Sequence, residues 1–330
     1  MLPDYPIVFR PIFKERIWGG RSLESYYNKS LPSGRLIGES WEISDRPGDE
    51  STVINGKFTG ASFRDLLSRF PDEIMGKTPL FRGRFPWLIK LLDARQDLSL
   101  QVHPPPALAE ELGGEPKDEL WYVAHADVGA KVYAGLKHGV TKQQFEEAVA
   151  SNSSTDLFHE ISVNQGDSLY LPSGRVHALG SGLVIFEIQQ NSDSTYRVHD
   201  WNRPGIDGKL RELHISESLR CINFGDFEPG LIQPLISQVG DLEIRHLIKT
   251  SVFEIVLYTT PAGFAHGGVS DLPEGVKVIG VISGRLVVNS GSKEFSILPG
   301  SFGVLPNLCR SARWHTQGVT KFLVVTSGLS

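Results

Sequence analysis

Short alternating and apolar runs, separated by glycine and proline, predict a chain built mainly from β-strands. Residues Gly38–Ser44 alternate in character, as expected of a strand, whereas Trp87–Leu92 is an apolar run broken only by Lys90, so we expect that strand to be buried on both faces. Further strands are expected at Glu119–Val123 and Lys131–Ala134, as two strands around a turn at Pro172–Gly174 within Val163–Glu187, and as short glycine-punctuated segments after about Asp226.

Four helices are expected between these strands. The pattern places them at Ser62–Met75, with an interruption at Pro71 and an end at Gly76, and at Pro106–Leu112, Lys142–Ala150 and His214–Asn223. Thr141 is the expected N-cap of the third helix. Irregularly spaced short strands with few helices favour a sandwich or jelly-roll barrel over a parallel α/β sheet.

A short internal similarity predicts that the fold is duplicated. Gln165–Pro172 resembles Leu298–Pro306, because in both a glycine turn leads through an apolar strand to a proline. The first copy continues to His177, whereas the second continues through Asn307–Arg310 with no histidine at the matching place. We therefore predict a mainly β protein of two jelly-roll barrels with a few inserted helices, over residues 1–225 and 226–330, of which the second binds no metal.

Composition and charge narrow the class of protein. The 330 residues are enough for two ordinary domains, and a net charge of −5 argues against a nucleic-acid partner. Two cysteines without C-x-x-C spacing are most simply buried thiols in a reducing compartment. The first residues contain no leader pattern, and no run of about 18 apolar residues is present to span a membrane. We therefore expect a cytoplasmic protein.

The stretch Leu98–Pro104 carries the most distinctive candidate chemistry. Read as a strand, it places Gln101 and His103 on one face, with Ser99 two positions earlier, and the strand stops at three prolines. An amide oxygen and an imidazole on one inward face form half of a metal site. An acid and a second histidine from elsewhere in the chain are expected to complete it.

The segment Gly166-x5-Pro172-x-Gly174-x2-His177 resembles the second motif of the cupin superfamily, a β-hairpin whose histidine points into a barrel. Gln101 and His103 stand where the first cupin motif has a histidine pair. The resemblance makes Glu119 that motif's acid, displaced by the inserted helix after His103. Gln101, His103, Glu119 and His177 then form a set of two nitrogen and two oxygen donors suited to Zn²⁺.

Five longer segments are similar to type I mannose-6-phosphate isomerases. They are Leu91–Pro104, Arg16–Gly20, Gly38–Ile43, Lys117–Tyr122 and Glu187–Val198. Together they cover roughly residues 7 to 220 in the family's order and resemble the short bacterial form, which has a catalytic jelly roll and a second barrel. The chain departs from many members at Pro105 and Pro106, where acidic residues are common. That difference lies in the loop after the ligand strand and leaves the ligands untouched.

The resemblance implies a role for each matching position. It implies one zinc ion per chain, held by Gln101, His103, Glu119 and His177. It also implies a catalytic arginine at Arg197 and pocket residues at Trp18, Ser99, Lys117 and Glu187. The substrate would be a small sugar phosphate, and we expect a monomer or weak homodimer with no membrane or nucleic-acid partner.

The expected chemistry is the interconversion of mannose 6-phosphate and fructose 6-phosphate. A proton leaves the carbon next to a carbonyl and returns to the neighbouring carbon through a cis-enediolate, whose charge zinc and Arg197 would stabilise. Arg197 could instead hold the phosphate. The proton carrier is open between Lys117, Glu187 and a zinc-bound water.

Other interpretations compete with this one. An iron-containing cupin oxygenase fits the four-residue set less well, and a non-catalytic sugar-binding protein would be expected to lose Arg197 or a ligand. A cupin metalloprotein that acts on or binds a different sugar phosphate is the main alternative.

Among the aromatic residues, Trp41, Trp121 and Trp201 are expected in the core, whereas we expect a glycine turn to expose the ring of Trp18. Asp193, Asp200, Asn202 and Arg203 form either a hydrogen-bonded brace for Arg197 or a solvated loop.

Overall fold

The computed structural model describes residues 2–151, 153–264, 267–269, 272, 274–291 and 293–329, and it is mainly β, as predicted. The chain forms two compact units. The first comprises the chain up to Ile12, Trp41–Leu88 and the chain from Gln233 onward, and the second comprises Phe13–Ser40 and Ile89–Ile232. The predicted boundary between residues 225 and 226 was based on a duplicated fold, whereas these units are defined by the compactness of their contacts. The boundary therefore stays a prediction. No helix in the described ranges is both long and apolar enough to cross a membrane.

The first unit contains a large antiparallel sheet. Its strands are β1 (Ile7–Arg10), β6 (Thr52–Val53), β16 (Leu235–Val239), β17 (Leu242–Lys249), β18 (Glu254–Thr260), β19 (Gly267–Gly268), β20 (Lys277–Ser290), β21 (Lys293–Ile297), β22 (Phe302–Leu305) and β23 (Arg313–Thr326). They follow the order β16-β17-β18-β23-β20-β22-β1-β6, with β19 beside β23 and β21 beside β20. The unit also contains the paired strands β4 (Asp45–Arg46) and β5 (Asp49–Glu50), and helices α2 (Phe63–Arg69) and α3 (Pro71–Met75).

Two strands of this sheet contradict the expectation of only short strands after Asp226. Both β20 and β23 are 14 residues long, and they pair from Val278 to Asn289 of β20. The register shifts on either side of Ser283, next to Gly284, which has φ +78°. The glycine therefore permits a bulge within a continuous strand, where the sequence pattern had indicated a turn between two strands.

Most residues of two further sheets belong to the second unit. The five-stranded sheet consists of β8 (Leu100–Val102), β10 (Lys131–Leu136), β11 (Phe158–Ser162), β13 (His177–Leu179) and β15 (Tyr196–His199), in the order β11-β10-β13-β8-β15. The six-stranded sheet consists of β2 (Ile12–Gly20), β3 (Ile37–Ile43), β7 (Trp87–Ala94), β9 (Glu119–Ala126), β12 (Ser168–Leu171) and β14 (Leu183–Gln190), in the order β12-β9-β14-β7-β3-β2. The helices are α1 (Ser22–Tyr27), α4 (Pro106–Ala109), α5 (Lys142–Ala150) and α6 (Ile215–Cys221).

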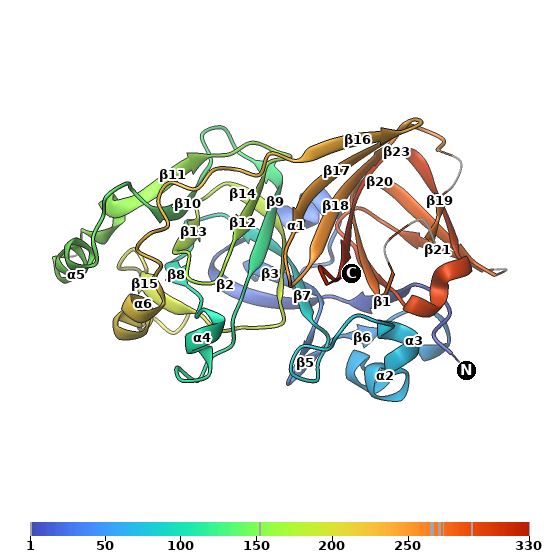
Figure 1. Cartoon of the computed structure of the whole chain (residues 1–330), viewed down its shortest axis with the longest axis horizontal. Coiled ribbons are helices and arrows are strands. Elements are labelled where there is room, and N and C mark those ends of the chain that lie inside the picture. Colours follow the sequence, from blue (N-terminus) through green and yellow to red (C-terminus); the bar gives the residue numbers. More distant parts are fainter. Residues whose placement is uncertain are drawn as a thin grey trace. The chain divides into compact units, whose positions relative to one another are not determined.

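The core of the second unit explains which side chains point into the site. One hydrophobic cluster combines Val132 and Leu179 of the five-stranded sheet with Val123 and Ile185 of the six-stranded sheet, so the two sheets pack face to face. A second cluster covers the opposite face of the five-stranded sheet, where α5 and α6 lie (Figure 1). Leu100 of β8 belongs to this second cluster. Because strand side chains alternate, Gln101 must face the space between the sheets.

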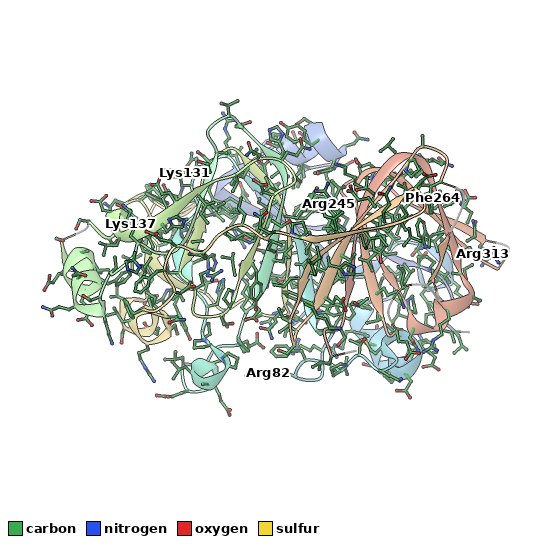
Figure 2. All side chains as sticks on the ribbon, turned by 45° about the horizontal axis from the view of Figure 1, so that its top comes forward. Arg82, Lys131, Lys137, Arg245, Phe264 and Arg313 are labelled. Atoms are coloured by element: carbon green, nitrogen blue, oxygen red, sulfur yellow. The ribbon has the colours of Figure 1, made fainter. Side chains whose placement is uncertain are left out.

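Most local predictions are confirmed by these elements. Helix α5 begins after Thr141, whose side chain accepts from the Gln144 amide in a capping box. The predicted helix at Ser62–Met75 is interrupted before Pro71. Helix α4 is shorter than expected and ends at Ala109. At the surface, Lys131 of β10 (labelled in Figure 2) pairs with an acid of the neighbouring strand.

The segment Val163–Glu187 differs from its prediction. It contains β12, β13 and the start of β14, where two strands were expected, because Gly182 at φ +78° turns the chain once more. The predicted internal similarity is present locally, since Gly166 (φ +97°) precedes β12 and Gly300 (φ +72°) precedes β22. The copies then diverge, because the chain after β22 forms the 3-10 helix Asn307–Ser311.

Candidate active site

Three polar side chains of the five-stranded sheet are adjacent on the face that looks toward the other sheet. Gln101 of β8 pairs in register with His177 of β13 on one side and with Arg197 of β15 on the other. Their sequence neighbours on β8 and β15, Leu100 and Tyr196, pack on the opposite face. Strand alternation therefore places an amide, an imidazole and a guanidinium side by side.

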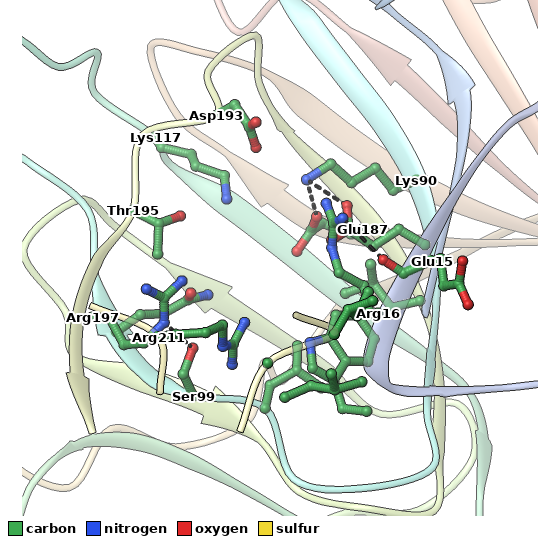
Figure 3. Close-up of a pocket in the computed structure, with 18 of the residues that line it drawn as sticks. Glu15, Arg16, Lys90, Ser99, Lys117, Glu187, Asp193, Thr195, Arg197 and Arg211 are labelled. Carbon is green, nitrogen blue, oxygen red and sulfur yellow. Dashed lines mark hydrogen bonds and ion pairs between the residues drawn. The ribbon is translucent and has the colours of Figure 1, made fainter. Parts of the chain in front are cut away.

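The facing sheet contributes charged residues from neighbouring strands, all buried except Arg16, whose side chain is 33% exposed. Glu187 of β14, Lys90 of β7, Glu39 of β3 and Arg16 of β2 follow each other in strand order, and we call these four residues the charged row. Lys90 Nζ lies 3.2 Å from Glu187 Oε2 and 3.7 Å from Glu39 Oε2, and Arg16 Nε lies 2.7 Å from Glu39 Oε1. Trp121 Nε1 donates to Glu187 Oε1 at 2.9 Å. Opposite charges thus alternate across the row (Figure 3).

Neighbouring charges decide the protonation of the row. Burial acts to lower the pKa of Lys90, but the carboxylates of Glu187 and Glu39 outweigh it and raise that pKa above its usual value. Burial raises the pKa of Glu187, and the charge of Lys90 opposes this. Lys90 is therefore an ammonium, and Glu187 is a carboxyl group held closer to neutrality than an exposed one.

His103, Glu119 and His177 form a second buried group, which we call the metal cluster. One ligand atom from each lies within 4.8 Å of the others. His103 Nε2 is 3.2 Å from Glu119 Oε1, and His177 Nε2 is 3.6 Å from Glu119 Oε2. The Gln101 amide nitrogen is 3.5 Å from His177 Nε2, so a rotation of this amide would turn its oxygen toward the cluster. Lys117 Nζ lies beside the cluster, 2.7 Å from Glu119 Oε1.

Both histidines turn Nε2 toward Glu119, and Lys117 Nζ also lies 3.4 Å from His103 Nε2. His103 Nδ1 donates to the carbonyl of Ser194 at 2.8 Å, and His177 Nδ1 donates to the carbonyl of Arg175 at 2.9 Å. A carbonyl can only accept, so each Nδ1 carries the proton and each Nε2 is an acceptor in the neutral ring. Burial lowers the pKa of His103 and lowers that of His177 to about 3. Both rings are therefore neutral near pH 7, as a metal ligand must be.

The carboxylate of Glu119 indicates what the cluster can hold. Burial acts to raise its pKa, but the charge of Lys117 and the neighbouring imidazoles lower it well below its usual value, so it is ionised. Both of its oxygens are completely buried, and Lys117 Nζ at 2.7 Å from Oε1 is a close cationic neighbour. A buried carboxylate that faces two imidazole nitrogens is suited to a divalent cation. These residues fit a zinc ion.

A cavity of about 670 Å³ lies between the charged row and two neighbours of the metal cluster, Gln101 and Lys117. Gln101 and Lys117 line it next to the cluster, and Glu187 and Lys90 line it along the row. The remaining polar lining is Glu15, Arg16, Glu39, Ser99, Asp193, Thr195, Arg197, Asp207 and Arg211. Figure 3 shows Arg197, Arg211 and Ser99 together on one side of this cavity, across from Lys90 and Glu187.

The structure brings the predicted site residues together, with one correction. Trp18 lines the cavity, but its ring is only 4% exposed and packs in the core, so the expected exposure is wrong. Gly19 does not form a turn. It lies in β2, where a Cβ would come within 2.4 Å of the Gly38 backbone, so glycine is needed for close strand packing.

The sequence interpretation missed Lys90 and Arg211 as site residues and left Asp200 open. A single lysine inside an apolar strand run was the available signal for Lys90. Asp200 is buried and bonds Arg203 and Arg211, so it fits neither the expected brace for Arg197 nor a solvated loop. Arg197 instead donates to Ser99 Oγ at 3.3 Å and to the Glu212 carbonyl at 2.8 Å.

The fold and site define a protein of the cupin fold with a histidine–carboxylate cluster beside a charged cavity. Comparisons identify its family. The model of the type I phosphomannose isomerase catalytic domain matches residues 7–115. The mannose-6-phosphate isomerase ManA of Bacillus subtilis is 34% identical over 91% of this chain and 93% of its own, and that of Streptococcus mutans is 32% identical over 95% of both chains.

Solved structures agree with this result. The crystal structure of the mannose 6-phosphate isomerase from Bacillus subtilis matches with a TM-score of 0.88 at 30% identity, over 97% of this chain and 99% of that one. A mannose 6-phosphate isomerase bound with zinc and yttrium shares the fold, with a TM-score of 0.74 at 15% identity over 98% of this chain and 99% of that one. The chain belongs to the type I mannose-6-phosphate isomerase family.

Proposed function

We propose that this chain is a zinc-dependent isomerase that interconverts mannose 6-phosphate and fructose 6-phosphate. The observation that carries the proposal is the ionised, buried Glu119 carboxylate, which faces two neutral histidines at the wall of a charged cavity. Membership of the isomerase family supplies the substrate, because the relatives' names specify mannose 6-phosphate. We further propose a cytoplasmic monomer or weak homodimer, with its chemistry within residues 1–225.

We propose that one zinc ion is held by His103, Glu119, His177 and Gln101. The first three are already arranged as nitrogen and oxygen donors, and the Gln101 amide lies beside His177. When bound, the ion would supply a Lewis acid that stabilises negative charge on the sugar oxygens. Support comes from the donor set and from the related structure that contains zinc.

The substrate's charge is proposed to lie toward Arg197. This guanidinium lines the cavity and is fixed by its bonds to Ser99 and to the Glu212 carbonyl. Since arginine remains charged, Arg197 can stabilise the phosphate or the negative charge that develops on the sugar during enediolate formation. Trp18 would form part of the apolar wall that excludes water from the sugar.

We propose Glu187 as the group that moves the proton between the two sugar carbons. It lines the cavity, and its raised pKa brings a carboxylate closer to the range of an efficient general base at neutral pH. The N–H of Trp121 and the ammonium of Lys90 fix both of its oxygens. Lys117 Nζ is held 2.7 Å from Glu119 Oε1, so it is better placed to orient a substrate hydroxyl than to accept a proton.

The test is direct turnover by the purified, zinc-loaded protein. We expect mannose 6-phosphate to be converted to fructose 6-phosphate, and the Glu187→Gln variant to lose at least about a hundredfold in kcat, because a general base contributes on this scale. Performing the reaction in deuterated water should place deuterium at the carbon that exchanges its proton. Turnover of another aldose phosphate but not of mannose 6-phosphate would overturn the proposed substrate and favour the alternative sugar phosphate.

A further inference from the structure

The segment after β15 places an arginine beside the cavity without a regular element to hold it. Pro204 and Leu210 pair as an isolated antiparallel bridge, and the turn between them contains Gly208 at φ +77°. Ile206 and Asp207 of this turn line the cavity, and so does Arg211, which comes directly after the bridge. Arg211 therefore stands at the end of an irregular segment, and its side chain needs another anchor.

Asp200 supplies that anchor. Arg211 Nε donates to Asp200 Oδ2 at 2.6 Å, and Arg211 Nη2 donates to Asp200 Oδ1 at 2.5 Å. The Asp200 side chain is only 6% exposed, so this paired contact lies away from bulk water. Within the described residues, both recorded hydrogen bonds of the Arg211 side chain go to Asp200, and Nη1 is left to face a ligand.

The Asp200 carboxylate also accepts hydrogen bonds from a second arginine, Arg203, which can be compared with Arg211. Arg203 Nε and Nη2 lie 3.3 and 3.2 Å from Asp200 Oδ1, so both of its contacts are longer than those of Arg211. Unlike Arg211, Arg203 does not line the cavity. The two arginines therefore share an anchor but differ in their access to the cavity.

Two cavity arginines lie close together around this anchor. Burial lowers the pKa of Arg197, and the positive charge of Arg211 is the next largest cause, so the two guanidinium groups repel each other. Arg197 uses Nε and Nη1 for Ser99 and the Glu212 carbonyl, which leaves Nη2. An anion with two charges, such as a phosphate monoester, would satisfy both groups and remove their repulsion.

We propose that Asp200 is a positioning residue that holds Arg211 beside Arg197, so that the two arginines together bind the substrate's phosphate. This inference rests on the proposed function. Asp200 acts through Arg211 and does not touch the substrate, because its carboxylate is occupied by the two arginines. Its contribution is substrate affinity, since an arginine that samples many rotamers binds phosphate less tightly than a fixed one.

The experiment is a double-mutant cycle on the zinc-loaded enzyme, with Asp200→Asn, Arg211→Gln and the double variant. We expect each single variant to raise KM for mannose 6-phosphate about tenfold with kcat changed less than about twofold, because the lost contact binds ground and transition states alike. The double variant should match Arg211→Gln within about twofold, since Asp200 has no role without Arg211. Arg203→Gln is the matched control and should leave KM near the wild-type value.

Several outcomes would overturn the inference. They are an unchanged KM in Asp200→Asn, a double variant whose loss equals the product of the single losses, and an Arg203→Gln variant as impaired as Arg211→Gln. If Asp200→Asn does not fold, as judged by its urea unfolding midpoint, Arg211→Lys replaces it. That variant keeps the charge but cannot bond both Asp200 oxygens, so an unchanged KM would also overturn the inference.

A binding measurement separates this inference from the proposed function. Calorimetric titration with inorganic phosphate should show weaker binding to Asp200→Asn and to Arg211→Gln, by a similar factor, than to the wild type. If the wild type fails to convert mannose 6-phosphate but shows this pattern, the proposed function fails and the role of Asp200 stands. Equal phosphate affinity in all variants would overturn the role of Asp200, whatever the enzyme turns over.

Discussion

The metal cluster and the charged row are both buried in the second unit, but their charges are balanced in different ways. In the row, Lys90 lies between Glu39 and Glu187, and Arg16 pairs with Glu39, so the protein itself supplies opposite charges. In the cluster, two neutral histidines and Lys117 Nζ, 2.7 Å from Glu119 Oε1, surround an ionised Glu119. The charges of the row balance one another, whereas the cluster combines one ion pair with nitrogen and oxygen donors that suit an added cation.

The buried charges of the row therefore stabilise the fold, whereas the buried charge of the cluster serves to bind a ligand. Buried ions are costly unless paired, and removing one partner of a pair leaves the other exposed to that cost. Changes in the row should therefore reduce stability as well as activity. Changes in the cluster should mainly reduce metal binding and activity.

The largest expected effect comes from the cluster. Glu119→Gln removes the anionic donor, and we expect loss of bound zinc and a fall in kcat/KM of at least about a thousandfold, because Lewis-acid stabilisation amounts to several kcal/mol. Metal content by elemental analysis and steady-state kinetics measure both. Glu160→Gln, which removes an exposed carboxylate paired with Lys131, is the control. An active Glu119→Gln enzyme with a full zinc content would contradict the assignment.

The row should respond next most strongly. Lys90→Met leaves Glu39 and Glu187 buried without their shared cation, so we expect the free energy of unfolding in urea to fall by about 3–5 kcal/mol. Lys277→Met is the matched control. Lys277 is equally buried, but its one recorded hydrogen bond among the described residues goes to the Gly275 carbonyl at 3.0 Å, and burial lowers its pKa to about 8. We expect that variant to change stability by less than about 1 kcal/mol. Equal losses of unfolding free energy in Lys90→Met and Lys277→Met would contradict the claim that Lys90 balances the buried acids of the row.

The cluster also predicts a pH dependence for the metal-free protein. The pKa of His177 falls from 6.5 to about 3 on burial, so the unfolded chain binds a proton below about pH 6.5 and the folded chain does not. Stability from this group is therefore present above pH 6.5 and lost as the pH falls, by about 1.4 kcal/mol per pH unit. Urea unfolding between pH 6.5 and 5 measures the slope. His177→Gln should have a shallower slope, and an equal slope would show that His177 is not responsible.

The smallest effect concerns the end of the row. Trp121→Phe removes the N–H donated to Glu187, and we expect a cost of about 2 kcal/mol beyond the change in packing, because the acceptor is a carboxyl group. Trp314→Phe is the control, since the buried Trp314 N–H finds no hydrogen-bond acceptor in the part of the chain that the structure describes. Equal losses of unfolding free energy in Trp121→Phe and Trp314→Phe would mean that the hydrogen bond from Trp121 to Glu187 does not stabilise the fold.

The sequence predicted the metal cluster better than the charged row, for a physical reason. Gln101 and His103 are two positions apart, and His177 belongs to a compact hairpin motif, so their arrangement depends on local spacing. The charged row is assembled from four strands, β2, β3, β7 and β14, that lie far apart in the chain and meet only in the folded sheet. Only the isolated Lys90 in an apolar run gave a local signal.

Long-range packing also explains the wrong predictions. A glycine turn was expected beside Trp18 and short glycine-punctuated strands after about Asp226, but Gly19 permits close contact between strands and Gly284 a bulge within β20. Arg211 lies 14 positions after Arg197, in a segment without regular spacing. Its place in the cavity wall and its bond to Asp200 depend on the folded structure, so the sequence pattern gave no sign of them. A glycine or an isolated charge has several structural uses, and the neighbouring strands decide which one applies.

The most direct test of the account is a zinc titration of the metal-free enzyme, followed at each addition by mannose 6-phosphate turnover. We predict that the metal-free protein remains folded but inactive, and that activity rises in proportion to zinc and reaches its maximum at one ion per chain. Full turnover by protein shown to contain no metal would contradict the account. So would zinc binding of unchanged strength when His103, Glu119 and His177 are all replaced.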